Sequence, residues 1–191
     1  MPAKNGTGGA TFHKAVAGKY ARSRFFMPAY FEGVNQMRYW LMKSEPDEVS
    51  FDDVLAAPAQ TVAWFGVRNY QARNFMRDAM QVGDGILFYH SSCAVPGVAG
   101  IAEVASGPYP DASQFDSAGK YFDPKATQAQ SRWISVDVRA KEKGRYLPLS
   151  EMRTMSALED MVLLQKGSRL SISPVTAGQW NAILETIRAQ A

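Results

Sequence analysis

From Arg38 onward, short apolar runs alternate with turn signals and amphipathic stretches. The first run, Tyr39 to Met42, reads as a buried strand that ends at Lys43-Ser44-Glu45-Pro46. A later run alternates apolar and polar residues with a period of two, as a half-buried strand does. Pro174 is expected to break the last run. These patterns predict strands over residues 39–42, 86–90, 98–104, 133–138 and 169–173.

Helical periodicity is clearest over residues 69–80, which carry an apolar stripe at steps of three and four. Ser50 is a good N-cap for a short helix that ends before Pro58, and Ser150 is expected to cap another short helix that runs through Met155. Thr176 is expected to cap a final helix. The apolar faces are formed by Phe51, Val54, Leu55, Ala72, Phe75, Met76, Ala79, Met80, Trp180, Ile183, Leu184 and Ile187.

The segments between these elements are irregular. Residues 106–131 are rich in Pro, Asp, Ser, Gln and Gly and predict a long loop, and Trp64 is expected in a turn just before Gly66. About five short strands separated by helices and one long loop do not form repeated βαβ units. They predict the α+β class, with a curled mixed sheet or small barrel and helices packed outside it.

Residues 1–36 differ from residues 37–191 and are treated as an N-terminal extension. One interpretation is a targeting presequence, although its glycines weaken any amphipathic helix. A second is that Met37 is the natural start. A third is an arm that packs on the domain through aromatic anchors, Phe25, Phe26, Tyr30 and Phe31.

The charge of the chain is concentrated in this extension. The whole chain carries a formal +3, but residues 1–36 carry +4, so the remaining 155 residues carry −1. A domain of this charge is not expected to bind nucleic acid tightly through bulk counterion release, and would need a local patch and a specific pocket. Cys93 is the single cysteine, which excludes an internal disulfide. No apolar run is long enough for a membrane helix, so we expect a cytoplasmic monomer without a membrane partner.

Four segments of the chain are distinctive as motifs: Tyr39-Trp40-Leu41-Met42-Lys43-Ser44-Glu45-Pro46, Trp64-Phe65-Gly66-Val67-Arg68-Asn69-Tyr70-Gln71-Ala72-Arg73-Asn74, Gly83-Asp84 with Phe88-Tyr89-His90-Ser91, and Ser168-Arg169-Leu170-Ser171 with Pro174-Val175. Together they resemble the EVE family of the PUA-like superfamily over about residues 38–187. One departure is Phe65, where family members often have an acidic residue. The resemblance implies a twisted, mixed β-barrel of about five to six strands with surrounding helices. It also implies a protein that recognises modified bases of DNA or RNA in a pocket.

A base lifted out of a strand needs apolar walls for its faces and donors and acceptors for its edge. The candidate walls are Trp40, Trp64, Phe88 and Tyr89, although an aromatic residue inside a strand, such as Trp40 or Phe88, is usually part of the core. The candidate polar contacts are Lys43, Ser44, Asn69, His90 and Ser91.

Phosphate contacts are expected from Arg68 and Arg73, near the helix end that follows Gly66. A solvated helix face is the alternative for Arg73 and Arg77. Glu45 is expected to pair with an arginine. Val67, Arg169 and Pro174 join the candidate ligand-binding residues because they lie in the motifs that carry the resemblance.

Two other classes of function, a small-molecule or peptide binding module and an enzyme, are alternatives to this interpretation. A small-molecule or peptide binding module would use the same pocket, since a fold does not determine a function. An enzyme would have to use His90 and Cys93, but residues three apart at a strand end rarely align for proton transfer. The sequence has no cysteine pair, no metal-ligand spacing, no phosphate-binding glycine loop and no GxSxG elbow. We therefore expect nucleic-acid binding, no catalysis, no metal and no cofactor.

Overall fold

The computed structural model describes residues 37–189. The three interpretations of residues 1–36, and the anchors named there, lie outside the described residues. No helix in the described part combines the length and the apolar character required to cross a membrane.

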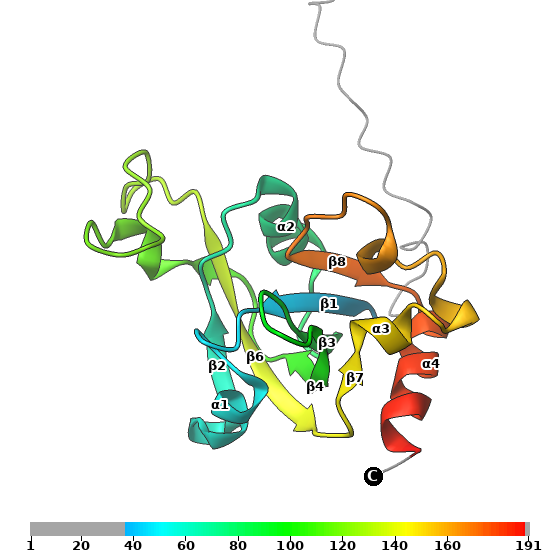
Figure 1. The fold of residues 1–191 in the computed structure, drawn as a ribbon. Helices are drawn as coiled ribbons and strands as arrows, with labels where there is room; N and C mark the ends of the chain where they lie inside the picture. Colours follow the sequence, from blue (N-terminus) through cyan, green and yellow to red (C-terminus); the bar gives the residue numbers. More distant parts are fainter. Residues whose placement is uncertain (1–36, 190–191) are drawn as a thin grey trace, which may run out of the picture. The chain divides into compact units, whose positions relative to one another are not determined.

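The described chain forms eight strands and four α-helices (Figure 1). The strands are β1 (Tyr39–Ser44), β2 (Thr61–Trp64), β3 (Gly85–His90), β4 (Gly97–Val104), β5 (Tyr109–Pro110), β6 (Ile134–Glu142), β7 (Leu147–Pro148) and β8 (Ile172–Val175). The helices are α1 (Phe51–Ala56), α2 (Tyr70–Asn74), α3 (Leu149–Met152) and α4 (Ala177–Arg188). Short 3-10 turns lie at Pro58–Gln60, Ala112–Phe115, Ser156–Leu158 and Val162–Leu164.

The strands form one mixed sheet in the order β2-β6-β4-β3-β1-β8, with β5 paired to β6 and β7 to β4. Only β1 and β3 run parallel, and α2 lies in the connection between them. The register of β3 against β4 shifts between Phe88 and Tyr89. Such a bulge increases the local twist of a sheet. The predicted α+β class and curled mixed sheet are confirmed.

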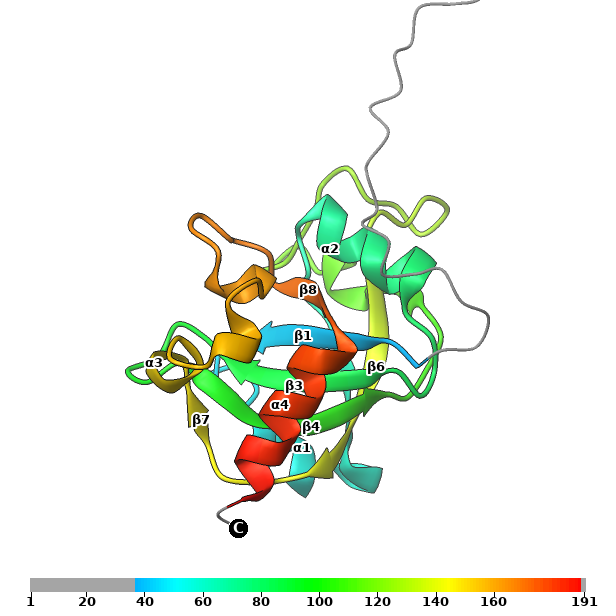
Figure 2. The ribbon, with the colours of Figure 1, turned by 90° about the vertical axis from the view of Figure 1, so that its right-hand side faces the viewer.

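The central strands are buried on both faces, which explains their nearly continuous apolar sequences. One face, including Leu41, Leu87 and Tyr89, packs against α4 and the segment after β7. Figure 2 shows α4 lying across β1, β3 and β4. Trp180 of α4 stacks on Tyr39 at 4.5 Å between ring centroids. The other face forms an aromatic interior around Trp40 and Phe88.

The predicted N-caps Ser50 and Thr176 are confirmed, but the cap predicted at Ser150 is wrong, because Ser150 lies inside α3, which begins after Pro148. Ser50 and Thr176 each form a capping box, in which a side chain three residues later bonds the backbone of the cap. Asn69 accepts hydrogen bonds from the amides of Gln71 and Ala72 at the start of α2. The helix predicted over residues 69–80 continues beyond α2 as a π-helical turn, Phe75–Ala79.

Two predictions about the strands are wrong. Pro174 does not end the last strand but lies inside β8, paired with Trp40 of β1. A proline is tolerated there because β8 is an edge strand, where a missing backbone N–H need not interrupt the sheet. Trp64 is not in a turn but is the last residue of β2, a strand that the prediction missed. The expected loop over residues 106–131 is confirmed in outline, with β5 and a 3-10 turn inside it.

Candidate functional site

A cavity of about 370 Å³ lies between the two edges of the curled sheet, and we call it the seam pocket. The end of β2 (Val62, Ala63 and Trp64) lines one side. Arg169 and Ser171, directly before β8, line the other. β2 and β8 are at opposite ends of the strand order, so only the curling of the sheet brings their residues to one cavity. Small-ligand sites commonly have volumes of this size.

Most of the predicted site residues lie around this pocket. Each of the four motifs contributes at least one of them, although the motifs are spread over residues 39–175. The predicted residues that line the pocket are Lys43, Ser44, Trp64, Gly66, Val67, Arg68, Asn69, Ser91 and Arg169.

Trp64 is held from beneath by the core. Its ring meets Phe88 edge-on, with centroids 5.3 Å apart, and Phe88 in turn contacts Phe51 at 5.3 Å. The side chain of Trp64 is only 7% exposed, so most of its surface is packed and only a small part borders the cavity. The indole is therefore fixed before any ligand arrives, which reduces the entropy cost of binding.

Asp111 holds the segment after Trp64, from Gly66 to Arg68, in place through hydrogen bonds. This buried carboxylate accepts the Gly66 amide at 3.0 Å and the Arg68 guanidinium at 2.8 Å, and it also accepts the amide and hydroxyl of Ser113. Burial by itself would raise the pKa of the Asp111 carboxyl. The donors of Ser113, Arg68 and Gly66 outweigh that effect and hold its pKa below the usual value.

Replacing Asp111 with asparagine is expected to lower the free energy of unfolding by about 3 kcal/mol at pH 7, because it leaves the half-buried Arg68 without its counterion. A carboxylate with a depressed pKa stabilises the fold above its unfolded pKa, and this contribution is lost as the pH falls through the folded pKa. The difference between wild type and variant should therefore shrink below about pH 4. Urea denaturation at pH 7 and pH 3 measures it.

Asp78→Asn is the matched control for this change. Asp78 also pairs with an arginine, Arg77, but both side chains are close to half exposed. An exposed pair contributes little, so this variant should lose well under about 1 kcal/mol. Equal losses in the two variants would contradict a structural role for Asp111 beneath the pocket.

Arg68 lines the pocket, but its donors are already engaged by the protein. Its Nε donates to the Tyr121 carbonyl at 2.9 Å, and its Nη atoms donate to Asp111, Ser113, Val67 and again to Tyr121. The guanidinium therefore anchors the long loop to the segment after β2, and its expected contact with a phosphate stays a prediction.

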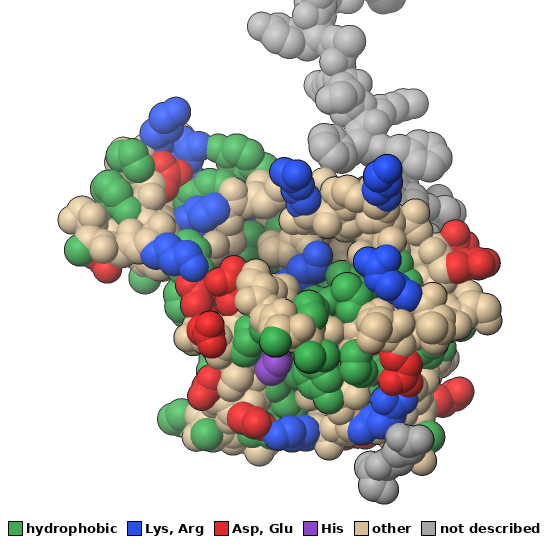
Figure 3. All heavy atoms as spheres, viewed as in Figure 1, with side chains coloured by type: hydrophobic (Ala, Val, Ile, Leu, Met, Phe, Trp, Pro, Cys, Tyr) green, Lys and Arg blue, Asp and Glu red, His purple; other side chains and the backbone are tan. Residues whose placement is uncertain are grey.

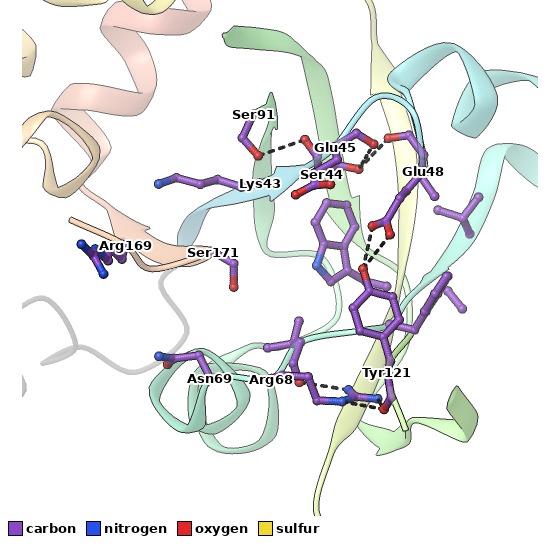
Figure 4. Close-up of a pocket in the computed structure, with 17 residues that line it drawn as sticks. Lys43, Ser44, Glu45, Glu48, Arg68, Asn69, Ser91, Tyr121, Arg169 and Ser171 are labelled. Carbon is purple, nitrogen blue, oxygen red and sulfur yellow. Dashed lines mark hydrogen bonds between the residues drawn. The ribbon is translucent and has the colours of Figure 1, made fainter. Parts of the chain in front are cut away.

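The sequence analysis missed the part of the pocket wall that Tyr121 and Glu48 form. Tyr121, in the long loop, donates its hydroxyl to Glu48 at 2.7 Å, and Lys120 pairs with the same carboxylate (Figure 4). Hydrogen bonds from Lys120 and Tyr121 lower the pKa of the Glu48 carboxyl. Phe65, the departure from the family pattern, is about half exposed and meets the Tyr121 ring edge-on at 5.9 Å. The loop composition carried no signal for these contacts.

The other side of the pocket is basic. Figure 4 shows Lys43 and Arg169 on the side away from Glu48 and Tyr121, with Asn69 below them. Within residues 37–189 neither cation forms an ion pair. Burial lowers the pKa of the Lys43 ammonium. In Figure 3, Lys and Arg side chains gather around a hollow over α2 and the segment before β8, with acidic side chains to its left.

The remaining polar groups are partly used. The Ser44 hydroxyl donates to the Val49 carbonyl at 2.6 Å, and the Ser91 hydroxyl donates to the Ser44 carbonyl at 3.2 Å. Their oxygens can still accept a hydrogen bond. Asn69 uses its side-chain oxygen to cap α2, which leaves its amide N–H groups to donate. Glu45 pairs with Lys120 at 3.9 Å, so the expected arginine partner is wrong.

Three predicted wall residues lie outside the pocket. Trp40 and Phe88 have no exposed surface and are core residues, and Trp40 donates its indole N–H to Asp84 at 2.9 Å. Phe88 acts on the pocket only by supporting Trp64. Tyr89, also buried, borders a neighbouring hollow instead.

Three predicted polar or turn residues are also placed elsewhere. His90 accepts the Phe51 amide at its Nε2, 3.1 Å away, and so supports the start of α1. Arg73 donates to the Arg132 carbonyl at 3.0 Å and lies 4.8 Å over the Tyr70 ring. Pro174 sits in β8, next to the pocket residues but not among them. None of these three residues lines the seam pocket, and their expected contact with a ligand stays a prediction.

Two observations bear on the enzyme alternative and on metal binding. His90 accepts the Phe51 amide at Nε2, so this nitrogen is engaged in supporting the start of α1. In residues 37–189, no group of three or more His, Cys, Asp or Glu side chains is arranged to hold a metal ion.

Comparisons with known proteins identify a family and several relatives for this chain. A family model described as the EVE domain matches residues 38–186. Thymocyte nuclear protein 1 of Homo sapiens is 39% identical over 168 residues, which cover 78% of this chain and 74% of that protein. The Danio rerio protein of the same name is 40% identical over 163 residues, covering 76% and 70% of the two chains.

Solved structures are similar over the same region. A Pseudomonas syringae protein is 48% identical with a TM-score of 0.74, covering 78% of this chain and 98% of its own. The human THYN1 protein, solved in complex with DNA containing 5-methylcytosine, is 39% identical with a TM-score of 0.71, covering 78% and 96%. The match of the family model to most of the chain, and of relatives along most of their length, shows that the chain belongs to the EVE domain family.

Proposed function

We propose that this chain is a non-enzymatic nucleic-acid-binding protein that accommodates a modified base in the seam pocket. The observation that carries the proposal is a pre-formed cavity in which an indole, a Tyr121–Glu48 wall and an unpaired basic side meet. The complex of the human relative with DNA containing 5-methylcytosine supports it, because that protein is 39% identical to this one.

The pocket offers both of the surfaces that a base requires. Trp64 supplies an aromatic surface, and base–aromatic stacking contributes about 1–3 kcal/mol per base. Val49, Val62 and Val67 supply apolar contacts for an added methyl group. Lys43, Asn69 and the Glu48 carboxylate supply the donors and acceptors for the edge of the base.

The test is a panel of oligonucleotide pairs at one fixed salt concentration. Each pair has the same sequence and differs by one methylated base, beginning with 5-methylcytosine against cytosine in DNA and continuing with methylated bases in RNA. A methyl group buried in an apolar part of the pocket should give about tenfold tighter binding of at least one modified strand. Equal affinities within every pair would refute the proposed preference.

A free small molecule is the alternative occupant, and the carboxylates of Glu45 and Glu48 on the rim are the feature that favours it. Thermal shift separates the two, since only ligands that prefer the native state raise its melting temperature. A free nucleoside or other metabolite that shifts the melting temperature more than any oligonucleotide would favour the alternative.

A further inference from the structure

A second hollow of about 490 Å³ adjoins the seam pocket, and we call it the basic hollow. Lys43 and Ser91 line both cavities, so the two are neighbours. The basic hollow lies between the end of β3, the start of α3 and the segment that leads toward β8. Its other polar residues include Arg153, Lys166 and Ser168.

The charges around this hollow have one sign. Lys43, Arg153 and Lys166 line it, and no Asp or Glu does. None of the three cations forms an ion pair with any residue in 37–189. The hollow therefore lacks an internal counterion for a side chain, Lys43, that is about half-buried.

Most other cations of the described chain are neutralised locally, which makes this cluster distinctive. Arg169, which lines the adjoining seam pocket, also forms no ion pair within residues 37–189. The paired ones are Arg68, Arg77, Lys120, Arg132, Arg139, Lys141, Lys143, Arg145 and Arg188.

Part of the lining of the hollow is apolar. Pro96, Leu149, Leu163 and Leu164 line it, and both Leu163 and Leu164 are partly exposed while they pack on the core. An anionic ligand with an apolar or sugar-like body fits such a combination, because the cations hold its charge and the leucines cover its less polar surface. An inorganic anion would contact only the cations and would leave the apolar residues uncovered.

We propose that the basic hollow binds the phosphate and sugar of the nucleotide next to the base held in the seam pocket. This inference rests on the proposed function. Lys43 lies on the boundary between the cavities, where the linking phosphate must pass, while Arg153 and Lys166 hold the phosphate beyond it. The strand therefore leaves the pocket across the end of β3 toward α3, and not along α2, where Arg73 is engaged by its own neighbours.

The experiment compares wild type with the double variant Arg153→Gln/Lys166→Gln. Binding of one oligonucleotide with 5-methylcytosine and its unmodified counterpart is measured over a range of salt concentrations. The double variant should bind both strands roughly tenfold more weakly at low salt, and the slope of log affinity against log salt should fall by about 1.5. The ratio of affinities for the two strands should stay as in wild type, because the base contacts are intact.

Lys141→Gln/Lys143→Gln is the matched control. It removes the same charge from residues that line neither cavity and that pair with Glu103 and Asp52. This variant should keep a slope within about 0.5 of wild type. Thermal denaturation of both double variants checks that they fold, and all four mutated side chains are solvent-exposed or half-exposed cations.

The outcomes for the two proposals are distinguishable. If neither variant changes the salt slope, or if both change it equally, the basic hollow is not the phosphate site. If the Arg153/Lys166 variant alone lowers the slope on both strands, the hollow is supported even where wild type shows no preference for the methylated strand. A lack of preference for the methylated strand would overturn only the proposal that the seam pocket holds a modified base.

Discussion

Trp64→Leu is expected to weaken binding of the preferred modified strand by about tenfold to a hundredfold. Leucine keeps an apolar side chain at the end of β2 but removes the aromatic surface, and with it about 1–3 kcal/mol of stacking. The preference over the unmodified strand should shrink as well, because the base is no longer held against the pocket wall. Fluorescence anisotropy with both oligonucleotides of a pair measures the two effects.

Trp180→Leu is the control for the cost of losing an indole. Trp180 is 8% exposed, close to the 7% of Trp64, and stacks on Tyr39 beneath α4, away from the seam pocket. Both variants should lose about 1–3 kcal/mol of stability, since each leaves a void in a packed region. Only Trp64→Leu should lose affinity. If both variants lost affinity in proportion to their stability, the indole of Trp64 would have no specific role in the ligand site.

The fold was largely predictable because its strands are buried on both faces. Continuous apolar runs at Tyr39–Met42 and Ile86–His90 are visible without knowledge of their partners. β2 was missed because Thr61 and Val62 are only partly buried and Ala63 is exposed, so its only buried apolar residue is Trp64. The edge position of β8, which permits Pro174 inside a strand, depends on strand order, and strand order is a tertiary property.

The pocket was predictable only where the recognised motifs reach it. Lys43, Trp64 and Asn69 belong to such motifs, and the structure places all three around one cavity. Tyr121 and Asp111 come from a loop whose composition resembles any other polar loop. Their roles arise from contacts at long range, to Glu48 and to Gly66, that no local pattern encodes.

The distinction between lining residues and supporting residues also required coordinates. Alternation along β3 puts successive side chains on opposite faces, so Phe88 and Tyr89 cannot both face the same cavity. The sequence alone does not say which face borders the ligand. Arg68 shows a related limit, because an arginine in the segment after Trp64 is equally suited to a phosphate and to the buried Asp111.

Gly66→Ala is expected to be the most damaging single substitution at the pocket, with a loss of about 2–5 kcal/mol of stability and of ligand binding together. Gly66 has φ +77°, a left-handed conformation that costs an alanine about 1–2 kcal/mol. A Cβ there would also lie 2.7 Å from the Tyr121 ring, which would have to move away from Glu48. Overpacking of this kind adds about 1–3 kcal/mol. Urea denaturation and the anisotropy assay measure the two losses.

Gly83→Ala separates the two causes. Gly83 has φ +93°, but a Cβ there meets nothing within 4 Å, so its substitution costs only the backbone strain and should leave binding intact. A second comparison uses Tyr121→Ala as the background, where the steric part of the Gly66→Ala cost should disappear and only the backbone part remain. If Gly66→Ala costs the same with and without the Tyr121 ring, the ring is not pressed against Gly66. The wall formed by Tyr121 and Glu48 would then not depend on a glycine at position 66.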